Sequence, residues 1–303
     1  MKKLIYRISF ICLLLTTVQV FAQWQSDVRL TNNSANSLGG RDKSIAVYGN
    51  NIHVVWQEHR DGDAEVYYKR STNSGVSWST DQRLSPVGNF SGAPTLALYQ
   101  STIHICWVDQ RLVPVDIFYI RSTDNGTTWQ SEVQITTDMM DSQYPSVSVS
   151  GSNVYLAWED NRHLPNKEIY FRRSTNSGVN WSSEVRLTND TVVSNDVSVA
   201  SIGQNIHLAW VSGMGNSEIY YRSSTNGGVN WSTEQRLTND LAISFYPCIA
   251  VSGQSINLFW SDARDGNYEI YFKRSTDGGA VWSIDSRRTN AANNSISPNA
   301  VAF

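Results

Sequence analysis

One short pattern, Ser-x-(Asp/Asn)-x-Gly-x-x-Trp, occurs five times in this chain of 303 residues. The copies begin at Ser71, Ser122, Ser174, Ser224 and Ser275, and the tryptophans that end them are 50 to 52 residues apart. A second series of tryptophans keeps the same spacing: Trp56, Trp107, Trp158, Trp210 and Trp260. A fixed period near 50 residues indicates one supersecondary unit that is repeated along the chain.

Each unit contains four short segments with β patterning. In the third unit these are 145–150, 153–158, 168–173 and 181–188, separated by turns and loops rich in Gly, Asn, Ser and Asp. Four antiparallel strands in every unit predict an all-β fold, a β-propeller of four-stranded blades.

The two ends of the chain extend this pattern. Residues 24–31 match the fourth strand of a unit, and residues 297–303 match the first strand. We therefore expect five complete blades plus the terminal strands of a sixth, in a six-bladed propeller that is truncated at its C-terminus. A five-bladed ring with two loose strands is the alternative.

The N-terminus has the pattern of a bacterial-type signal peptide. Three basic residues precede or enter a short apolar run over 8–20, which ends at Val20-Phe21-Ala22. We expect cleavage after residue 22 and a secreted propeller over 23–303. The run is too short to span a membrane. Its removal leaves 21 basic against 27 acidic residues, so a nucleic-acid partner is not expected. We expect a monomer.

The repeated motif has a local physical explanation. Its third position is Asn in three copies and Asp in two, and an amide replaces a carboxylate only where the role is hydrogen bonding. Its glycine permits a positive φ in the turn. The motif tryptophan is then expected to pack between neighbouring sheets, which is a structural role.

With this motif on a turn between β segments, the chain resembles the sialidase (neuraminidase) superfamily, whose propellers carry Asp-boxes, also called BNR repeats. The resemblance covers residues 24–303. It implies a glycan-directed protein, and, if an enzyme, a retaining exo-α-sialidase of the glycoside hydrolase class. A catalytically inactive propeller that binds proteins at the cell surface is the alternative. No cofactor or metal is expected.

Sialidases hold a substrate carboxylate with three arginines and attack with a tyrosine. By resemblance, Arg41, Arg111 and Arg264 would bind the carboxylate. Arg41 stands in Gly-Arg-Asp-Lys, where the family has Arg-Ile-Pro. Tyr246 would be the nucleophile and Asp61 the proton donor. Tyr144 and His163 are further expected ligand contacts.

The residues themselves allow a second interpretation of the arginines. In four units x-(Asp/Glu)-x-Arg follows the second-series tryptophan, and an acid begins the next segment. One arginine between two acids indicates a clamp that orders the loop, whereas a ring of arginines could surround an anion pocket. Ligand contacts are expected at loop positions that do not repeat: Arg41, Asp42, Phe90, Asp138, Met139, Met140, Tyr144, Asp196, Phe245 and Tyr246.

Three other groups are expected to be structural. His53, His104 and His207 alternate with apolar residues in the second segments of their units. Cys106 and Cys248 have no zinc-site spacing and are expected to be buried. The 61–65 turn has alternating oxygen ligands but lacks a full calcium loop, so a polar turn is expected.

Overall fold

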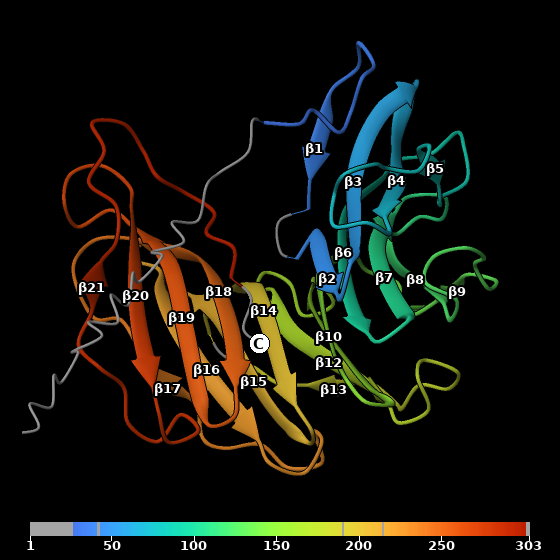
Figure 1. Cartoon of the computed structure of the whole chain (residues 1–303). Coiled ribbons are helices and arrows are strands. Elements are labelled where there is room, and N and C mark those ends of the chain that lie inside the picture. Colours follow the sequence, from blue (N-terminus) through green and yellow to red (C-terminus); the bar gives the residue numbers. More distant parts are fainter. Residues whose placement is uncertain (1–26, 41–42, 190, 214, 301–303) are drawn as a thin grey trace, which may run out of the picture. The chain divides into compact units, whose positions relative to one another are not determined.

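The computed structural model describes residues 27–40, 43–189, 191–213 and 215–300, and all regular structure within these ranges is β. The chain divides into a short unit, Met1–Asn33, and a compact unit, Ser34–Phe303, which contains all the strands (Figure 1). The predicted signal peptide over 1–22 lies outside the described residues. Among the residues that are described, no helix is long and apolar enough to cross a membrane.

The compact unit consists of five antiparallel sheets that follow one another along the chain. The first sheet contains β1 (Ser37–Gly39), β2 (Ile45–Tyr48), β3 (Asn51–Asp61), β4 (Asp63–Ser71) and β5 (Gln82–Arg83). The second contains β6 (Ser91–Tyr99), β7 (Thr102–Asp109), β8 (Asp116–Ser122) and β9 (Val133–Gln134). The third contains β10 (Ser142–Ser150), β11 (Asn153–Asp160), β12 (Glu168–Ser174) and β13 (Val185–Arg186). The fourth contains β14 (Ser194–Ile202), β15 (Asn205–Ser212), β16 (Glu218–Ser224) and β17 (Gln235–Arg236). The fifth contains β18 (Ser244–Ser252), β19 (Ser255–Asp262), β20 (Glu269–Ser275) and β21 (Ser286–Arg287).

These sheets are the predicted propeller blades, which confirms the fold class. The first blade has five strands only because its innermost strand is split into β1 and β2, which both pair with β3. The outermost strands are shorter than expected. In blade 3 only Val185 and Arg186 pair with β12, although the sequence predicted a strand over 181–188. Ser182 N–H still donates to the Arg173 carbonyl of β12 at 2.8 Å, and the Trp181 ring packs against Tyr119 of the preceding blade.

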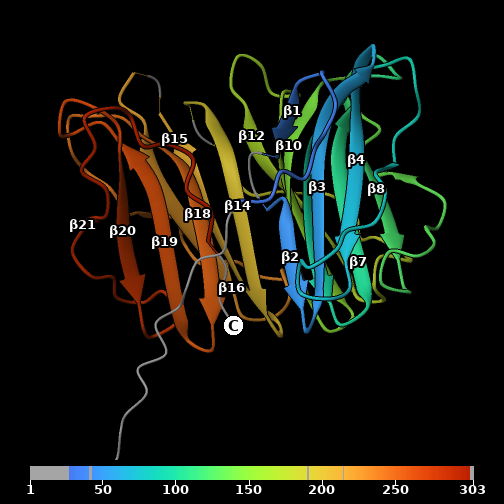
Figure 2. The ribbon, with the colours of Figure 1, turned by 45° about the horizontal axis from the view of Figure 1, so that its top comes forward.

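The innermost strands surround a central channel. β2, β6, β10, β14 and β18 together line a cavity of about 500 Å³, and each of these strands contacts the next in order. Figure 2 shows two of them, β14 and β18, side by side. The lining is mainly apolar, with residues such as Leu98, Val149 and Val251. The Lys43 ammonium donates a hydrogen bond to the carbonyl of Val199, which links blade 1 to blade 4.

Each complete four-stranded blade has a bulge near the start of its innermost strand. In β10 the register with β11 breaks between Gln143 and Ser146, and Tyr144 has φ of 49°. A proline follows the bulge residue in three blades, and its missing N–H cannot join the ladder. Bulges redirect a side chain locally. The equivalent residues are Ala93, Asp196 and Tyr246, with φ of 47°, 49° and 52°.

The repeated motif joins each blade to the one before it. The Trp181 ring meets the edge of the Tyr119 ring at a centroid distance of 5.1 Å. Gly178 has φ of 79°, and a Cβ there would lie 1.9 Å from the Tyr119 hydroxyl, so only glycine fits. Trp129, Trp231 and Trp282 make the same edge contact with Tyr68, Phe171 and Tyr221. The predicted structural role of the motif is therefore observed between blades.

The C-terminal residues follow the path of one more innermost strand. Ser297 has a φ of 56°, close to the φ values of the four bulge residues. Ser295 N–H donates a hydrogen bond to the Tyr268 carbonyl, and in blade 5 Ser244 N–H donates the equivalent bond to the Ser217 carbonyl. Ala300 N–H donates to Cys248 Sγ, in the place where Ile249 N–H donates to Ser198 Oγ. Five blades are therefore followed by the first-strand path of a sixth.

Candidate functional site

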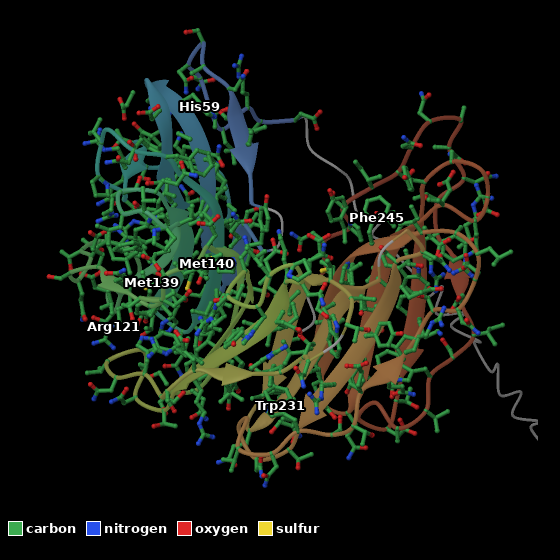
Figure 3. The ribbon with its side chains drawn as sticks, turned by 180° about the vertical axis from the view of Figure 1, so that it is seen from behind. His59, Arg121, Met139, Met140, Trp231 and Phe245 are labelled. Atoms are coloured by element: carbon green, nitrogen blue, oxygen red, sulfur yellow. The ribbon has the colours of Figure 1, made fainter. Side chains whose placement is uncertain are left out.

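The blades present two different ends. The repeated motif turns occupy one end, and the bulges with the loops that follow the second strands occupy the other. Figure 3 shows this separation in the C-terminal blades, where Phe245 and Trp231 lie at opposite ends. The first end is built from repeated residues, so it is nearly the same in every blade. Side chains that differ between blades gather at the second end, which we call the bulge face.

A small cavity of about 30 Å³ lies where the bulges of four blades converge. It is lined by the bulge residues and those that follow them: Ala93, Tyr144, Pro145, Asp196, Val197, Tyr246 and Pro247. Tyr144 and Tyr246 are 102 positions apart in sequence, and the ring of blades brings both beside Asp196. Non-glycine residues with positive φ cost roughly 1–3 kcal/mol each, so neighbouring structure must hold these side chains in place.

A larger cleft of about 370 Å³ adjoins this cavity and shares Ala93 and Tyr144 with it. Three glutamines from blades 1, 2 and 3 line it, namely Gln57, Gln110 and Gln143. The remaining lining is aromatic or aliphatic: Leu38, Gly39, Phe90, Ala93, Val108, Val115 and Tyr144. We call this the amide cleft.

Local contacts position two residues that line the amide cleft, Gln57 and Phe90. Gln57 Oε1 accepts a hydrogen bond from Ala93 N–H at 3.3 Å, and Gln57 Nε2 lies 3.3 Å from His59 Nε2. A Cβ on Gly92 would meet Gln57 Oε1 at 2.4 Å and the Phe90 ring at 2.6 Å. The absence of a side chain at position 92 therefore lets both groups lie over the backbone.

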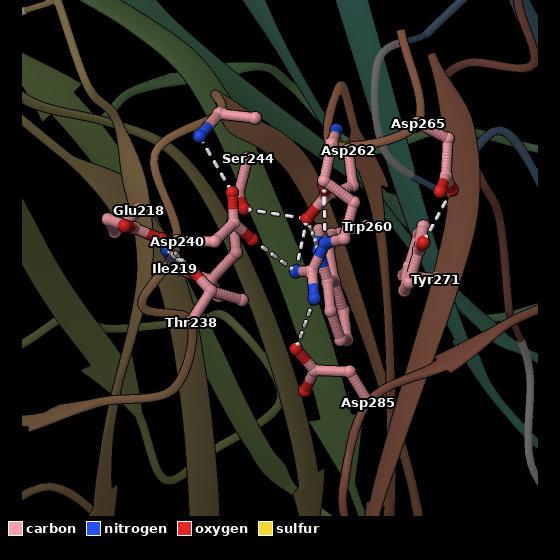
Figure 4. Close-up of polar contacts among 12 residues, drawn as sticks. Glu218, Ile219, Thr238, Asp240, Ser244, Trp260, Asp262, Asp265, Tyr271 and Asp285 are labelled. Atoms are coloured by element: carbon pink, nitrogen blue, oxygen red, sulfur yellow. Dashed lines mark hydrogen bonds and ion pairs between the residues drawn. The ribbon is translucent and has the colours of Figure 1, made fainter. Parts of the chain in front are cut away.

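The repeated arginines are held by carboxylates. In blade 3, Arg162 Nε and Nη2 bond both oxygens of Asp160 at 2.7 Å, and Nη1 bonds Glu184 at 2.7 Å. The guanidinium lies 4.1 Å above the Tyr170 ring. Burial raises the pKa of Asp160, but hydrogen bonds from Arg162 and Trp158 outweigh this and hold that pKa below its ordinary value. Blades 1, 2 and 5 repeat the arrangement around Arg60, Arg111 and Arg264. Figure 4 shows two of the acids of the blade 5 clamp, Asp262 and Asp285.

The second acid of this clamp differs from the predicted one. The sequence indicated Glu168 as the second partner of Arg162, but Glu184, which precedes β13, takes that place. Glu168 instead accepts bonds from Thr188 Oγ1 at 2.5 Å and Arg186 Nη2 at 2.6 Å. It therefore fastens the outermost strand rather than the loop.

The predicted site residues lie in separate places. Tyr246 and Tyr144 line the small cavity, while Arg111 and Arg264 bond Asp109 and Asp262 of their own blades. Arg41 lies outside the described residues.

Asp61 and His163 also bond within their own blades. Asp61 accepts bonds from Tyr67 at 2.5 Å and Arg83 at 3.0 Å, and both lower its pKa. His163 Nε2 lies 2.7 Å from the Tyr170 hydroxyl.

The three repeated histidines are buried, as expected. Nδ1 of His53, His104 and His207 lies 2.7 Å from a tyrosine hydroxyl in each case. Burial lowers the pKa of His53 and His207 to about 4 and that of His104 to about 3, so these rings are neutral at pH 7. Within the described ranges no three His, Cys, Asp or Glu side chains gather as metal ligands.

Among the solved structures with a similar fold are a sialidase, an α-L-arabinofuranosidase and an α-L-arabinanase. A Hadza microbial sialidase matches with a TM-score of 0.59 and 15% identity, over 81% of this chain and 58% of that chain. An α-L-arabinofuranosidase from Fusarium graminearum matches with 0.59 and 15%, over 82% and 80%. An α-L-arabinanase from Penicillium chrysogenum matches with 0.59 and 14%, over 87% and 84%. The chain folds as a sialidase-like β-propeller.

At this level of identity the similarity to solved structures shows the fold. Neither the models of known protein families nor the curated proteins contain a match to this sequence. The chain spans less than two thirds of the length of the microbial sialidase. The chemistry of this sialidase-like propeller therefore depends on its own side chains.

Sequence reasoning did not identify the three glutamines of the amide cleft. Gln57 stands out when the repeats are compared position by position, because the other blades have different residues there. The position after the second-series tryptophan is Gln57 in blade 1 and Val108, Glu159, Val211 and Ser261 in the others. Asp196 was expected among the loop contacts, but its place between two tyrosines becomes visible only when the propeller is formed.

Proposed function

We propose that this sialidase-like propeller is a secreted glycan-recognition protein that binds its ligand on the bulge face. The observation that carries the proposal is the convergence of Tyr144, Asp196 and Tyr246 around one small cavity, which shares Ala93 and Tyr144 with the amide cleft. Aromatic faces stack on the C–H faces of sugar rings, and amide and carboxylate groups bond their hydroxyls. A concave site with a few convergent polar groups is the usual form of a ligand pocket.

The neighbouring folds support this proposal. The Fusarium and Penicillium proteins are described as complexes with arabinobiose, and the microbial protein is described as a sialidase. All three act on glycans by those descriptions. The proposal of secretion is supported by the basic and apolar pattern over 1–22. N-terminal sequencing of exported protein tests it, with Gln23 as the expected first residue.

A glycan microarray probed with the full chain tests the proposed function. Tyr144→Ala is expected to weaken binding, because the ring supplies stacking area on the bulge face. Tyr99→Ala is the matched control, because Tyr99 is 43% exposed and ends the innermost strand of blade 2 away from its bulge. Equal binding by wild type and Tyr144→Ala, or loss of binding only in Tyr99→Ala, would place recognition elsewhere.

Hydrolysis is a second candidate function, and one observation favours it. Asp196 lines the same cavity as Tyr246, whereas Asp61 bonds Tyr67 and Arg83 in blade 1. A nucleophilic Tyr246 would therefore have Asp196 as its nearest carboxylate in the cavity wall. Hydrolysis of fluorogenic sialoside and α-L-arabinofuranoside substrates, lost in Asp196→Asn and retained in Asp61→Asn, would support this function. No turnover by the wild type would exclude it for these substrates.

A further inference from the structure

We infer that the amide cleft binds an uncharged oligosaccharide. This inference rests on the proposed glycan recognition and names the class of ligand. The cleft volume of about 370 Å³ lies within the range of about 300–1,000 Å³ usual for ligand pockets. Tyr144 and Ala93 line both the cleft and the small cavity, whose volume of about 30 Å³ is near that of one water molecule, so the cleft is the part that can take a sugar.

The lining of the amide cleft matches the hydrogen-bonding groups of sugar hydroxyls. Each glutamine amide offers two N–H donors and a carbonyl acceptor, and each hydroxyl both donates and accepts. Gln57, Gln110 and Gln143 come from three different blades, so they can reach a ligand from several directions. Phe90 and Tyr144 add two aromatic surfaces for stacking.

The same lining does not suit an anionic sugar. None of the ten lining residues of the amide cleft carries a charge. A carboxylate or sulfate that left water for this cleft would lose solvation. The Lys167 ammonium, 6.0 Å from the centroid of the Tyr144 ring, is already paired with Glu159 at 3.3 Å. Asp196 in the adjoining cavity adds a carboxylate close to the ligand path.

The nearby arginines are not available to neutralise such an anion. Arg60 bonds Glu58 and Asp81, and Arg111 bonds Asp109 and Glu132. Both guanidiniums also lie over aromatic rings, at 4.3 Å from Tyr67 and 4.1 Å from Phe118. Their release toward a ligand would leave buried carboxylates such as Glu58 and Asp109 without their cation.

Calorimetric titration of the full chain with two groups of oligosaccharides tests the inference. The uncharged group is arabinotetraose, xylotetraose and cellotetraose, and the anionic group is sialyllactose and tetragalacturonate. At least one uncharged oligosaccharide is expected to bind, with an affinity that does not change between low and high salt. Binding of anionic oligosaccharides alone would overturn the inference but leave the proposed glycan recognition standing. Binding of neither group by calorimetry, together with a blank glycan microarray, would overturn both.

Variants locate the binding to the amide cleft. Gln110 is exposed, so Gln110→Ala is expected to fold normally and to weaken binding of the uncharged ligand about tenfold. Gln235→Ala, an exposed glutamine in β17, is the control and should bind like wild type. Gly92→Ala is expected to displace Phe90 and Gln57 and to lower affinity, with a lower melting temperature because Gln57 loses its bond from Ala93 N–H. Unaltered binding in both cleft variants would overturn the inference.

A change of charge provides an independent readout. Gln110→Lys places a cation in the amide cleft and is expected to give measurable, salt-sensitive binding of tetragalacturonate. Gln235→Lys adds the same charge outside the cleft and should not. If both lysine variants gained equal affinity for the anion, the selectivity would come from the overall charge of the protein and not from the cleft.

Discussion

At the scale of single residues, the repeated motif shows why a carboxylate and an amide exchange freely at its third position. Asn176 Oδ1 accepts bonds from Ser174 Oγ and Asn180 N–H at 2.9 Å each, and Asp124 Oδ1 accepts the same pair in blade 2. The common requirement is an acceptor oxygen. The preference for Asn or Asp at this position therefore depends only on hydrogen bonds within the motif, and it could be predicted from the sequence alone.

The first prediction follows from this acceptor role. Asn176→Asp is expected to change the free energy of unfolding by less than about 0.5 kcal/mol, because the acceptor oxygen is kept. Asn176→Ala removes it and is expected to cost about 1 kcal/mol, as the loss of a helix cap does. Urea unfolding of both variants checks this. Equal losses in the two variants would contradict the hydrogen-bonding role.

The buried histidines predict an acid-sensitive stability. Their pKa values near 3 to 4 in the folded protein lie below the ordinary value near 6.5, so the unfolded chain binds more protons between these limits. Stability is expected to be fully present above pH 6.5 and to fall as the pH drops toward 4. His104→Asn, which copies Asn257 at the equivalent position of blade 5, should lessen this fall. Urea unfolding at several pH values measures it, and an unchanged pH profile in the variant would contradict the prediction.

At the scale of elements, the strands of each blade could be predicted from the alternating pattern, but their partners across blades could not. The acid that begins the third strand lies close to the clamp arginine in sequence, which suggested a pairing. In the folded chain Glu168 accepts hydrogen bonds from Thr188 and Arg186. Arg162 bonds Glu184, which lies 22 positions later in the sequence. The amide cleft was missed for the same reason, because its glutamines belong to three blades.

The motif tryptophans give a prediction about contacts between blades. Trp181 packs against Tyr119 of the preceding blade, so Trp181→Ala is expected to cost about 3 kcal/mol of stability. Trp78 holds the same place in blade 1, and no ring stacks on it among the described residues. Trp78→Ala should therefore cost clearly less. Denaturant unfolding of both variants compares them, and equal costs would show that the contact between blades is not the source of the stability.

At the scale of the whole compact unit, the two end blades differ from the inner ones. Ile249 of the innermost strand in blade 5 is fully buried against blade 4, whereas Ile45 at the equivalent place in blade 1 is 53% exposed. At blade 5, Arg288 stands where the other blades have Leu or Ile, with its guanidinium 4.4 Å from the Phe272 ring. Both differences lie on blade faces that no complete blade covers within the part of the chain that the structure describes.

This difference predicts unequal effects of the same substitution. Ile249→Ala is expected to cost about 2–5 kcal/mol, as buried isoleucine truncations do, and Ile45→Ala much less. Thermal melts of the full chain compare the two. An equally large loss in Ile45→Ala would show that this face of blade 1 is covered in solution.

Repeated residues build the propeller, and we propose that unrepeated residues on the bulge face recognise the ligand. Glycan binding and thermal melting of Arg162→Lys and Tyr246→Ala test it most directly. Arg162→Lys is expected to lower the melting temperature and keep binding, because lysine cannot form the planar fork to Asp160. Tyr246→Ala is expected to keep the melting temperature nearly unchanged and lose most glycan binding. Loss of binding in Arg162→Lys at an unchanged melting temperature, with normal binding in Tyr246→Ala, would contradict the account.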